Sequence, residues 1–274
     1  MSPVTTTLSP AGSLQPRRRK PWPNAAIAAV SLVLIATLWT VVSTSGWLPQ
    51  GYLPSPQELF AELMTLATVG YKGTSLWMHI GISLFRTLTG FMLGIALGIP
   101  LGLLTGYNRV AGAAVSPVMA FIRPIPPIAF IPMVVLYFGL GETGKVVLIF
   151  WTAFNYVHVN AHAGAAGVPI SYLRAAKSIG LTDRQTFFRV VLPAAIPQIF
   201  TGLKVGMALA WAVVVAAELT GAQSGLGYMI ADAALTFRIA AVFIGIALIG
   251  LIGLALNIAL NFLEARVVHW RGRT

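Results

Sequence analysis

Three charged residues inside or just after long apolar runs of this sequence could carry chemistry. Arg123 lies within the run 113–140, Glu218 near the end of the run 199–219, and Asp232 shortly after it. A charge at the centre of a membrane helix costs about 2.5–3.5 kcal/mol on insertion scales, and it needs a partner or water. Arg123 is therefore a candidate for attracting an anion, although it could instead reach toward a membrane interface. Glu218 could pair with a cation, and for Asp232 a surface loop is the simpler interpretation.

The segment 139–145 matches the first seven positions of a phosphate-binding loop, from Gly139 to Lys145. The next residue is Val146, which has no hydroxyl to hold magnesium, and no β-strand pattern precedes the segment. We therefore interpret it as a tight turn between two apolar runs rather than a nucleotide site.

Two histidines, His158 and His162, stand four residues apart and so share one helix face, a spacing that metal ligands use. Asn160 takes the place of an intervening acid, and no third ligand is nearby. We expect no metal here. The sequence also offers no inward pair of carboxylates and no Ser–His set, so no catalytic residues are predicted.

Composition places the chain among membrane proteins that cross the bilayer several times. Hydrophobic residues make up 57% of it and charged residues only 9%. The net charge of +11 could suggest nucleic acid, but the basic residues flank apolar runs instead of forming one patch. The chain has no cysteine, which excludes disulfides and thiolate metal sites.

The predicted fold is all-α, with six transmembrane helices and both termini in the cytoplasm. The expected spans are 25–42, 79–104, 113–140, 145–163, 199–219 and 239–262. A cleaved secretory signal is the alternative for the first, but that run exceeds a usual signal core. The positive-inside bias supports the count, since only Lys72, Lys145 and Arg238 lie near the outer loops. The basic residues assigned to the cytoplasm are Arg17, Arg18, Arg19, Lys20, Arg109, Arg174, Lys177, Arg184, Arg189, Arg266, Arg271 and Arg273.

This topology divides the chain into a flexible basic tail (1–24), a membrane domain (25–265) and a basic cytoplasmic C-terminus (266–274). The outer loop 46–78 contains an amphipathic helix, 57–64, that is too polar to span. In the second span, glycines recur at every fourth position, which allows close helix packing or reflects mere glycine tolerance. They are Gly90, Gly94, Gly98 and Gly102.

The third span contains a proline cluster that removes helical hydrogen bonds. Pro124, Pro126, Pro127 and Pro132 fall within it, next to Arg123. In a membrane, freed backbone carbonyls are tolerated only beside protein or a water-lined path. We therefore expect a broken helix that faces a translocation path, with Arg123, Pro124, Pro126, Pro127 and Glu218 as candidate path residues.

The polar segment, residues 169–193, stands between long apolar runs and is predicted to form two short helices and a bend. Gly180 can adopt the left-handed conformation that ends a helix, and Thr182 with Gln185 has capping-box spacing. Pro193 is expected to stop the second helix. If Ser171 caps the first, Arg174 occupies its third position, where positive charge opposes the helix dipole.

Part of this segment resembles the EAA loop of binding-protein-dependent ABC importer permeases, the cytoplasmic segment that docks into the ATP-hydrolysing partner. The matching residues are Ala175, Ala176, Gly180, Val190, Leu192 and Pro193. One position departs from the family pattern, because Arg174 stands where an acid is usual. By this resemblance the coupling loop comprises these residues together with Arg174.

Further motifs look like the nitrate, sulfonate and taurine branch of these permeases and extend the resemblance over residues 25–265. They include 53–56, 84–91, 123–127, 137–142 and 217–230. The family's other substrates, thiamine-pyrimidine precursors, bicarbonate and aromatic acids, are not separated by these motifs. The resemblance implies a type I importer core and a small anionic solute such as a sulfonate, taurine or nitrate.

The resemblance also implies partners and a location. The expected partners are an ATP-binding subunit, a periplasmic or lipid-anchored solute-binding protein and a second permease, either an identical copy or a different chain. The location is the bacterial plasma (inner) membrane, in contact with lipid and without nucleic acid. No cofactor is expected, because ATP is bound by the partner. A proton-coupled carrier and an intramembrane enzyme are the alternatives, and the sequence halves show no inverted repeat of the kind common in secondary carriers.

Overall fold

The computed structural model describes residues 24–47, 49 and 51–269, and these residues are almost entirely helical. The chain forms two units, 1–50 and 51–274, which we describe separately. The described part of the first unit is mainly α1 (Asn24–Thr44), a 21-residue helix with largely exposed apolar side chains. At 1.5 Å per residue its length is about 30 Å, enough to cross a bilayer core. The predicted basic residues 17–20 lie outside the described residues.

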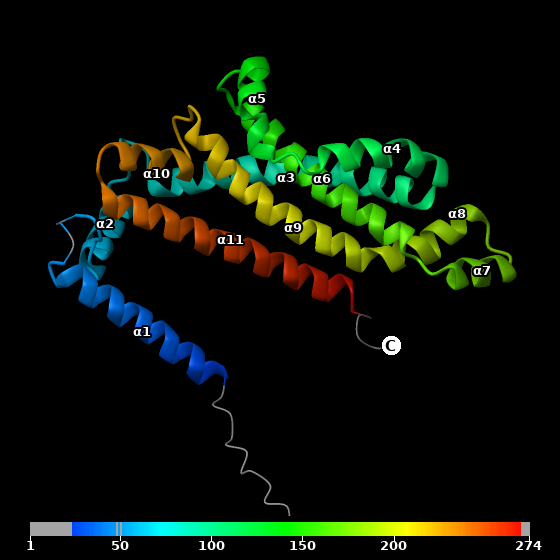
Figure 1. Cartoon of the computed structure of the whole chain (residues 1–274), viewed down its shortest axis with the longest axis horizontal. Helices are drawn as coiled ribbons and strands as arrows, with labels where there is room; N and C mark the ends of the chain where they lie inside the picture. The colour runs from blue at the N-terminus through cyan, green and yellow to red at the C-terminus, as the bar shows by residue number, and fades with distance from the viewer. Residues whose placement is uncertain (1–23, 48, 50, 270–274) are drawn as a thin grey trace, which may run out of the picture. The chain divides into compact units, whose positions relative to one another are not determined.

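The second unit is built on α3, α6 and α9, with α6 packed against both of the others (Figure 1). Helix α11 runs beside α9; α2 and α10 lie at one end of the unit, and α7 and α8 at the other. The elements are α2 (Pro56–Thr68), α3 (Leu76–Tyr107), α4 (Arg109–Ile122), η1 (Pro127–Phe130), α5 (Ile131–Phe138), α6 (Glu142–Ala166), α7 (Ile170–Ser178), α8 (Asp183–Thr186), η2 (Phe187–Val191), α9 (Leu192–Leu219), α10 (Leu226–Leu235) and α11 (Ile239–Val267).

Glycines on α3 allow α6 to approach it closely, as predicted. A Cβ added at Gly94 would lie 2.6 Å from the Cβ of Ala153, and one added at Gly102 would lie 2.6 Å from the Cβ of Ala161. Gly90 and Gly98 meet α6 in the same way, at Ile149 and Val157. Because helix packing in lipid depends on close van der Waals contact, this glycine stripe holds the centre of the unit together.

The predicted third span is broken, as expected from its prolines. Helix α4 and the segment Pro127–Phe138 meet at an angle of 85°. Four described helices are long and apolar enough to cross a membrane, and the bent pair makes up to five. The remaining expected span corresponds to α6, a 25-residue helix with several polar residues that α3 and α9 cover. The chain is thus a multi-pass helical protein, while the count of six stays a prediction.

The predicted amphipathic helix is α2, and its start is a complete capping box. The Ser55 hydroxyl accepts from the Glu58 N–H at 3.3 Å, and the Glu58 carboxylate accepts from the Ser55 N–H at 2.7 Å. Pro56 occupies the first turn, where its missing N–H costs nothing. With 13 residues, α2 is too short to span the bilayer.

Candidate functional site

The polar segment 169–193 forms α7, a bend and α8, all at one end of the second unit (Figure 1). Gly180 has φ of +76°, and the Leu181 N–H donates to the Ala176 carbonyl at 3.0 Å, which closes α7 as a Schellman-type turn. The Thr182 hydroxyl then accepts from the Gln185 N–H at 3.3 Å, and Gln185 Oε1 accepts from the Thr182 N–H at 2.9 Å. The predicted bend and capping box are confirmed.

Two local predictions for this segment were wrong. Pro193 does not stop a helix, because the helix runs without a break from Asp183 to Leu219. The π-helical turn Phe187–Val191 comes just before Pro193. It shifts the hydrogen bonding by one residue, so the helix continues past the missing proline N–H.

The second correction concerns Arg174. Helix α7 begins at Ile170 with Pro169 before it, so Ser171 is not the cap and Arg174 is the fifth helical residue instead of the third. The predicted charge–dipole conflict at Arg174 therefore does not arise, because the dipole effect is confined to the first turn. The Arg174 side chain is exposed, and its carbonyl accepts from the Ser178 hydroxyl at 3.0 Å.

The polar segment is attached to the end of α3 through Tyr107. The Tyr107 ring packs against Phe187 with 5.4 Å between centroids, and its hydroxyl lies 3.4 Å from the Asp183 carbonyl. An open groove between α7, α8 and the α3–α4 junction is lined by Leu173, Arg174 and other residues. The segment is thus an exposed, basic helix–turn–helix fixed to two long helices.

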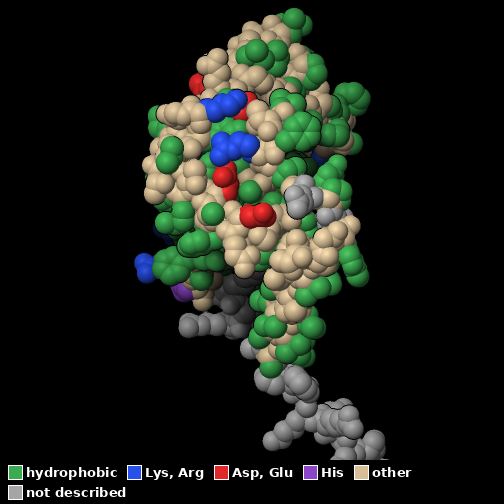
Figure 2. Space-filling model, turned by 90° about the vertical axis from the view of Figure 1, so that its left-hand side faces the viewer, with side chains coloured by type: hydrophobic (Ala, Val, Ile, Leu, Met, Phe, Trp, Pro, Cys, Tyr) green, Lys and Arg blue, Asp and Glu red, His purple; other side chains and the backbone are tan. Residues whose placement is uncertain are grey.

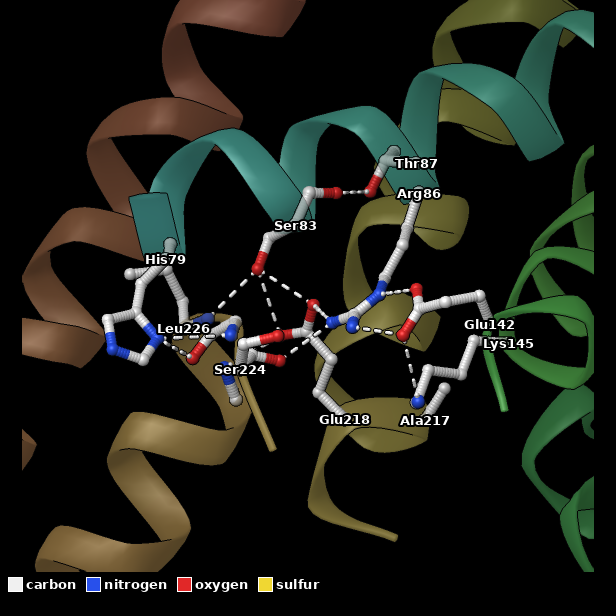
Figure 3. Close-up of polar contacts among 12 residues, drawn as sticks. His79, Ser83, Arg86, Thr87, Glu142, Lys145, Ala217, Glu218, Ser224 and Leu226 are labelled. Carbon is white, nitrogen blue, oxygen red and sulfur yellow. Dashed lines mark hydrogen bonds and ion pairs between the residues drawn. The ribbon is translucent and has the colours of Figure 1, made fainter. Parts of the chain in front are cut away.

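The opposite part of the bundle contains an ionic cluster around a buried arginine, which we call the Arg86 cluster: Ser83, Arg86, Glu142 and Glu218 (Figure 3). The Arg86 side chain is 2% exposed, and its Nε and Nη2 each donate to one oxygen of Glu142 at 2.6 Å. Its Nη1 donates to Glu218 Oε1 at 2.7 Å and to the Ser224 carbonyl at 2.8 Å. One guanidinium thereby joins α3, α6, α9 and the loop after α9.

Glu218 is held by several donors besides Arg86. The Ser83 hydroxyl lies 2.8 Å and 2.9 Å from its two carboxylate oxygens, and the Gly227 N–H donates to Oε2 at 2.8 Å. Gly225 has φ of +114°, and a Cβ there would lie 2.4 Å from the Glu218 carboxylate. The glycines of the 224–227 turn are therefore required for the chain to wrap closely around this acid.

The prediction that Glu218 pairs with a cation is confirmed, and the cation is Arg86. A role of Glu218 in the path stays a prediction. Sequence reasoning did not single out Arg86, Ser83 or Glu142 for a site. Arg86 lies in an expected apolar span, so the charge-burial argument used for Arg123 also applies to it. Its partners are 56 and 132 residues away, which local patterns do not reveal.

The turn predicted at 139–145 is present. Gly139 has φ of +69°, and α6 begins directly after the turn at Glu142. Lys145 is 7% exposed, and its amine donates to the Leu140 carbonyl at 2.9 Å and to Glu142 at 3.3 Å. The lysine is thus engaged within the turn and in the pairing of Glu142, which supports our rejection of a phosphate loop.

Asp232 lies on helix α10 rather than in a loop, which corrects the simpler interpretation. Its carboxylate accepts from the Tyr71 hydroxyl at 2.7 Å and from Lys72 at 2.8 Å. Hydrogen bonding to Lys72 and Tyr71 lowers the pKa of Asp232, while burial raises the pKa of Tyr71. Arg238 pairs with Glu62 at 2.5 Å and stacks over the Tyr71 ring. Acidic and basic side chains consequently gather on the face of the α2 and α10 end (Figure 2).

Arg123 lies at the C-terminal cap of α4, at the break predicted from the prolines. Its side chain is exposed, and it has no ion pair within the described part of the chain. It lines a cavity together with His158 and His162. Pro124 and Pro126 lie in the irregular turn that follows α4, and Pro127 begins η1. The structure thus brings Arg123 and the prolines together at the break, while Glu218 lies in the Arg86 cluster.

The two histidines share one neighbour. Thr105 Oγ1 lies 3.3 Å from His158 Nε2 and 3.0 Å from His162 Nδ1. Among the described residues, no group of three or more His, Asp or Glu side chains could hold a metal ion. The pair is thus organised around a hydroxyl from α3.

A multi-pass helical bundle with a broken span and an exposed basic helix–turn–helix at one end has the architecture of a transporter subunit. Residues 94–269 match the family of binding-protein-dependent transport system inner membrane components. The chain belongs to this family.

Named relatives cover nearly the whole chain. It is 35% identical to the taurine transport system permease protein TauC of Escherichia coli (strain K12), over 92% of this chain and 93% of that protein. It is 31% identical to the nitrate import permease protein NrtB of Synechocystis sp., over 95% of this chain and 98% of that protein. It is 32% identical to the putative aliphatic sulfonates transport permease protein SsuC of Bacillus subtilis (strain 168), over 87% of this chain and 85% of that protein.

A solved structure supports the fold. A chain of the MetNI methionine ABC transporter, in an inward-facing conformation, aligns with a TM-score of 0.62 at 18% identity. The alignment covers 70% of this chain and 97% of that one. The fold is therefore that of a type I ABC importer permease.

Proposed function

We propose that this permease forms the path by which an ABC importer moves a small anion of the sulfonate, taurine or nitrate type. ATP is bound and hydrolysed by a separate subunit, and the permease itself has no cofactor. The proposal rests mainly on the polar segment 169–193, an exposed basic helix–turn–helix fixed to α3 and α9. The named functions of the relatives, taurine, sulfonate and nitrate transport, support the choice of solute.

The polar segment is suited to passing a movement of the ATPase to the membrane helices. Asp183–Leu219 is continuous, so a shift of α8 moves α9 as one body. The Tyr107–Phe187 contact carries the same shift to α3, and the glycine stripe joins α3 to α6. Closely packed helices transmit displacement instead of absorbing it. The coupling residues in this proposal are Arg174, Ala175, Ala176, Gly180, Val190, Leu192 and Pro193.

The translocation path in this proposal runs along the break between α4 and α5. Backbone groups freed by Pro124, Pro126 and Pro127 need water or protein around them, and Arg123 adds a positive charge at that point. The path lies between two permease copies, a homodimer. Glu218 serves this path indirectly, by holding α9 to α3 through Arg86.

The proposed orientation places the polar segment and both termini in the cytoplasm. Arg109, Arg174, Lys177, Arg184 and Arg189 belong to elements at that end, which agrees with the positive-inside rule. The end formed by α2 and α10 then faces a periplasmic or lipid-anchored solute-binding protein. The membrane is the bacterial plasma (inner) membrane.

The test is reconstitution of the permease in proteoliposomes with its ATPase and binding protein. We expect taurine, an alkyl sulfonate or nitrate to accumulate only with ATP, and a hydrolysis-deficient ATPase to abolish uptake. Liposomes that contain the permease alone, under an imposed pH gradient, are the control. Uptake by the permease alone would contradict the proposal and indicate a proton-coupled carrier.

A further inference from the structure

A cavity of about 160 Å³ lies between α3, α4 and α6, toward the end that carries the polar segment. It exceeds the room that one water needs, about 15 Å³ on the same measure. Much of its lining is apolar, with Val115 and Met119 from α4 and Val159 from α6. The polar groups that line it include Thr105, Arg123, His158 and His162. A few polar groups on an apolar wall are typical of a site for an organic molecule.

The hydrogen bonds of Thr105 leave a donor or acceptor free on a buried histidine. The single hydroxyl proton of Thr105 is directed to the Gly102 carbonyl at 3.1 Å, so its oxygen can accept from both His158 Nε2 and His162 Nδ1. His158 is 3% exposed, and its Nδ1 has no hydrogen-bond partner among the described residues. Buried polar atoms are nearly always paired, so this unpartnered nitrogen makes His158 an unusual residue of the lining.

The charge of the lining is one-sided. Arg123 is its only Lys or Arg, and none of the described lining residues is an acid. A guanidinium that has no ion pair among the described residues, on a lining without an acid, favours an anionic group. The apolar wall favours a carbon body attached to that group.

We propose that this cavity binds an organic anion with a short aliphatic body, such as an alkyl sulfonate, in preference to nitrate. The inference rests on the proposed transport function and names its substrate class. Arg123 holds the anionic head, while Val115, Met119 and Val159 contact the methylenes. Each methylene that leaves water for the wall strengthens binding about fourfold, a gain that nitrate cannot obtain. Thr105 and His162 lie near the C-terminal ends of α3 and α6. In the proposed orientation the site is therefore close to the cytoplasmic side, where an importer releases its solute.

The probe is ethanesulfonate, added to the full-length permease in phosphatidylcholine nanodiscs, with its methyl protons observed by saturation-transfer NMR. We expect saturable binding that empty nanodiscs lack. Arg123→Ala should weaken it about tenfold or more, because a charge-assisted contact is lost, and Val159→Phe should weaken it by filling the cavity. Arg109→Ala, which removes the same charge from the other end of α4, is the matched control and should bind like wild type.

The competition arm tests the choice of ligand. Nitrate at the same concentration should displace much less ethanesulfonate than propanesulfonate does. Equal displacement by nitrate, or binding that Arg123→Ala and Val159→Phe both leave unchanged, would overturn the inference. ATP-driven uptake in the complete transporter is measured separately. If uptake persists although ethanesulfonate does not bind the permease in nanodiscs, the proposed site is wrong, while the proposed function stands.

Discussion

Arg86 of α3 and Glu218 of α9 form an ion pair of 2.7 Å whose side chains are only 2% and 0% exposed. A buried pair repays its desolvation cost only when the remaining hydrogen-bonding groups are also satisfied. Here Glu142, Ser83, Gly227 and the Ser224 carbonyl supply the additional contacts. The pair and its additional contacts therefore hold α3, α6, α9 and the glycine turn together. We expect it to affect the stability of the protein more directly than solute binding.

Removing one member of this pair should destabilise the protein strongly. Arg86→Met leaves the Glu218 carboxylate buried without its cation, a change that costs about 3–5 kcal/mol in proteins. We expect a marked fall in the thermal unfolding temperature of the purified permease. The double variant Arg86→Met with Glu218→Met should recover part of the loss, because no unpaired charge then remains in the interior.

Lys72→Met is the matched control, since it breaks the Lys72–Asp232 pair, whose side chains are 52% and 20% exposed. Solvent screens such a pair, so the change in unfolding temperature should be much smaller. Equal losses for Arg86→Met and Lys72→Met would show that burial of the Arg86–Glu218 pair contributes little.

The glycine stripe offers a second stability test. Gly94→Ala places a methyl group 2.6 Å from the Ala153 Cβ and 2.8 Å from the Phe154 backbone nitrogen, so α3 and α6 must separate. Overpacking of this kind costs about 1–3 kcal/mol. Gly81→Ala on the same helix meets no atom within 4 Å and should instead be neutral or slightly stabilising. The test is the thermal unfolding temperature of both variants. An unchanged unfolding temperature for Gly94→Ala would contradict the close packing of α3 and α6.

Features that depend on local spacing could be predicted from the sequence. The glycine stripe, the bend at Gly180, the Thr182 capping box and the break near Arg123 each follow from residues within one helix or turn. The Arg86 cluster could not be assembled in this way, because its members come from distant parts of the chain. Local prediction also failed at Pro193, where the π-helical turn lets the helix continue. At Arg174 the error came from the helix start, which lies at Ile170.

The contacts of Asp232 predict that the stability of the α2 and α10 end depends on pH. Lys72 and Tyr71 hold the pKa of Asp232 below its ordinary value, so the ionised acid stabilises the fold above the unfolded-state pKa, near 4. This contribution is lost as the pH falls through the lower folded-state pKa. We expect Asp232→Asn to lower the unfolding temperature slightly at neutral pH, with the difference from wild type shrinking in acid. A difference that grows in acid would contradict the assignment.

The proposed topology predicts which sites can be labelled from outside the cell. The chain has no cysteine, so a single cysteine gives an unambiguous signal. Val69 and Ile179 are 78% and 76% exposed and cap the C-terminal ends of α2 and α7. These two helices lie at opposite ends of the second unit (Figure 1). A membrane-impermeant maleimide should label Val69→Cys in intact cells, and Ile179→Cys only after the membrane is opened. Labelling of Ile179→Cys in intact cells would invert the topology.

The bend at Gly180 should be essential for coupling to the ATPase. Its φ of +76° is strained for any side chain with a Cβ and most of all for a β-branched one, at a cost of about 1–3 kcal/mol. Gly180→Val should therefore change the angle between α7 and α8, while the buried helices stay intact because no atom lies within 4 Å of the added Cβ. We expect weaker co-purification with the ATPase and loss of solute-stimulated ATP hydrolysis, at a nearly unchanged unfolding temperature.

Gly141→Val provides the control for this variant. Gly141 also has no atom within 4 Å of an added Cβ, but its φ of −70° suits any residue, and it lies in the turn before α6 rather than in the polar segment. Hydrolysis and co-purification should then stay close to wild type. If Gly180→Val also retains solute-stimulated ATP hydrolysis and co-purification with the ATPase, the polar segment is not where the ATPase docks. The proposed coupling through α8 and α9 would then be wrong.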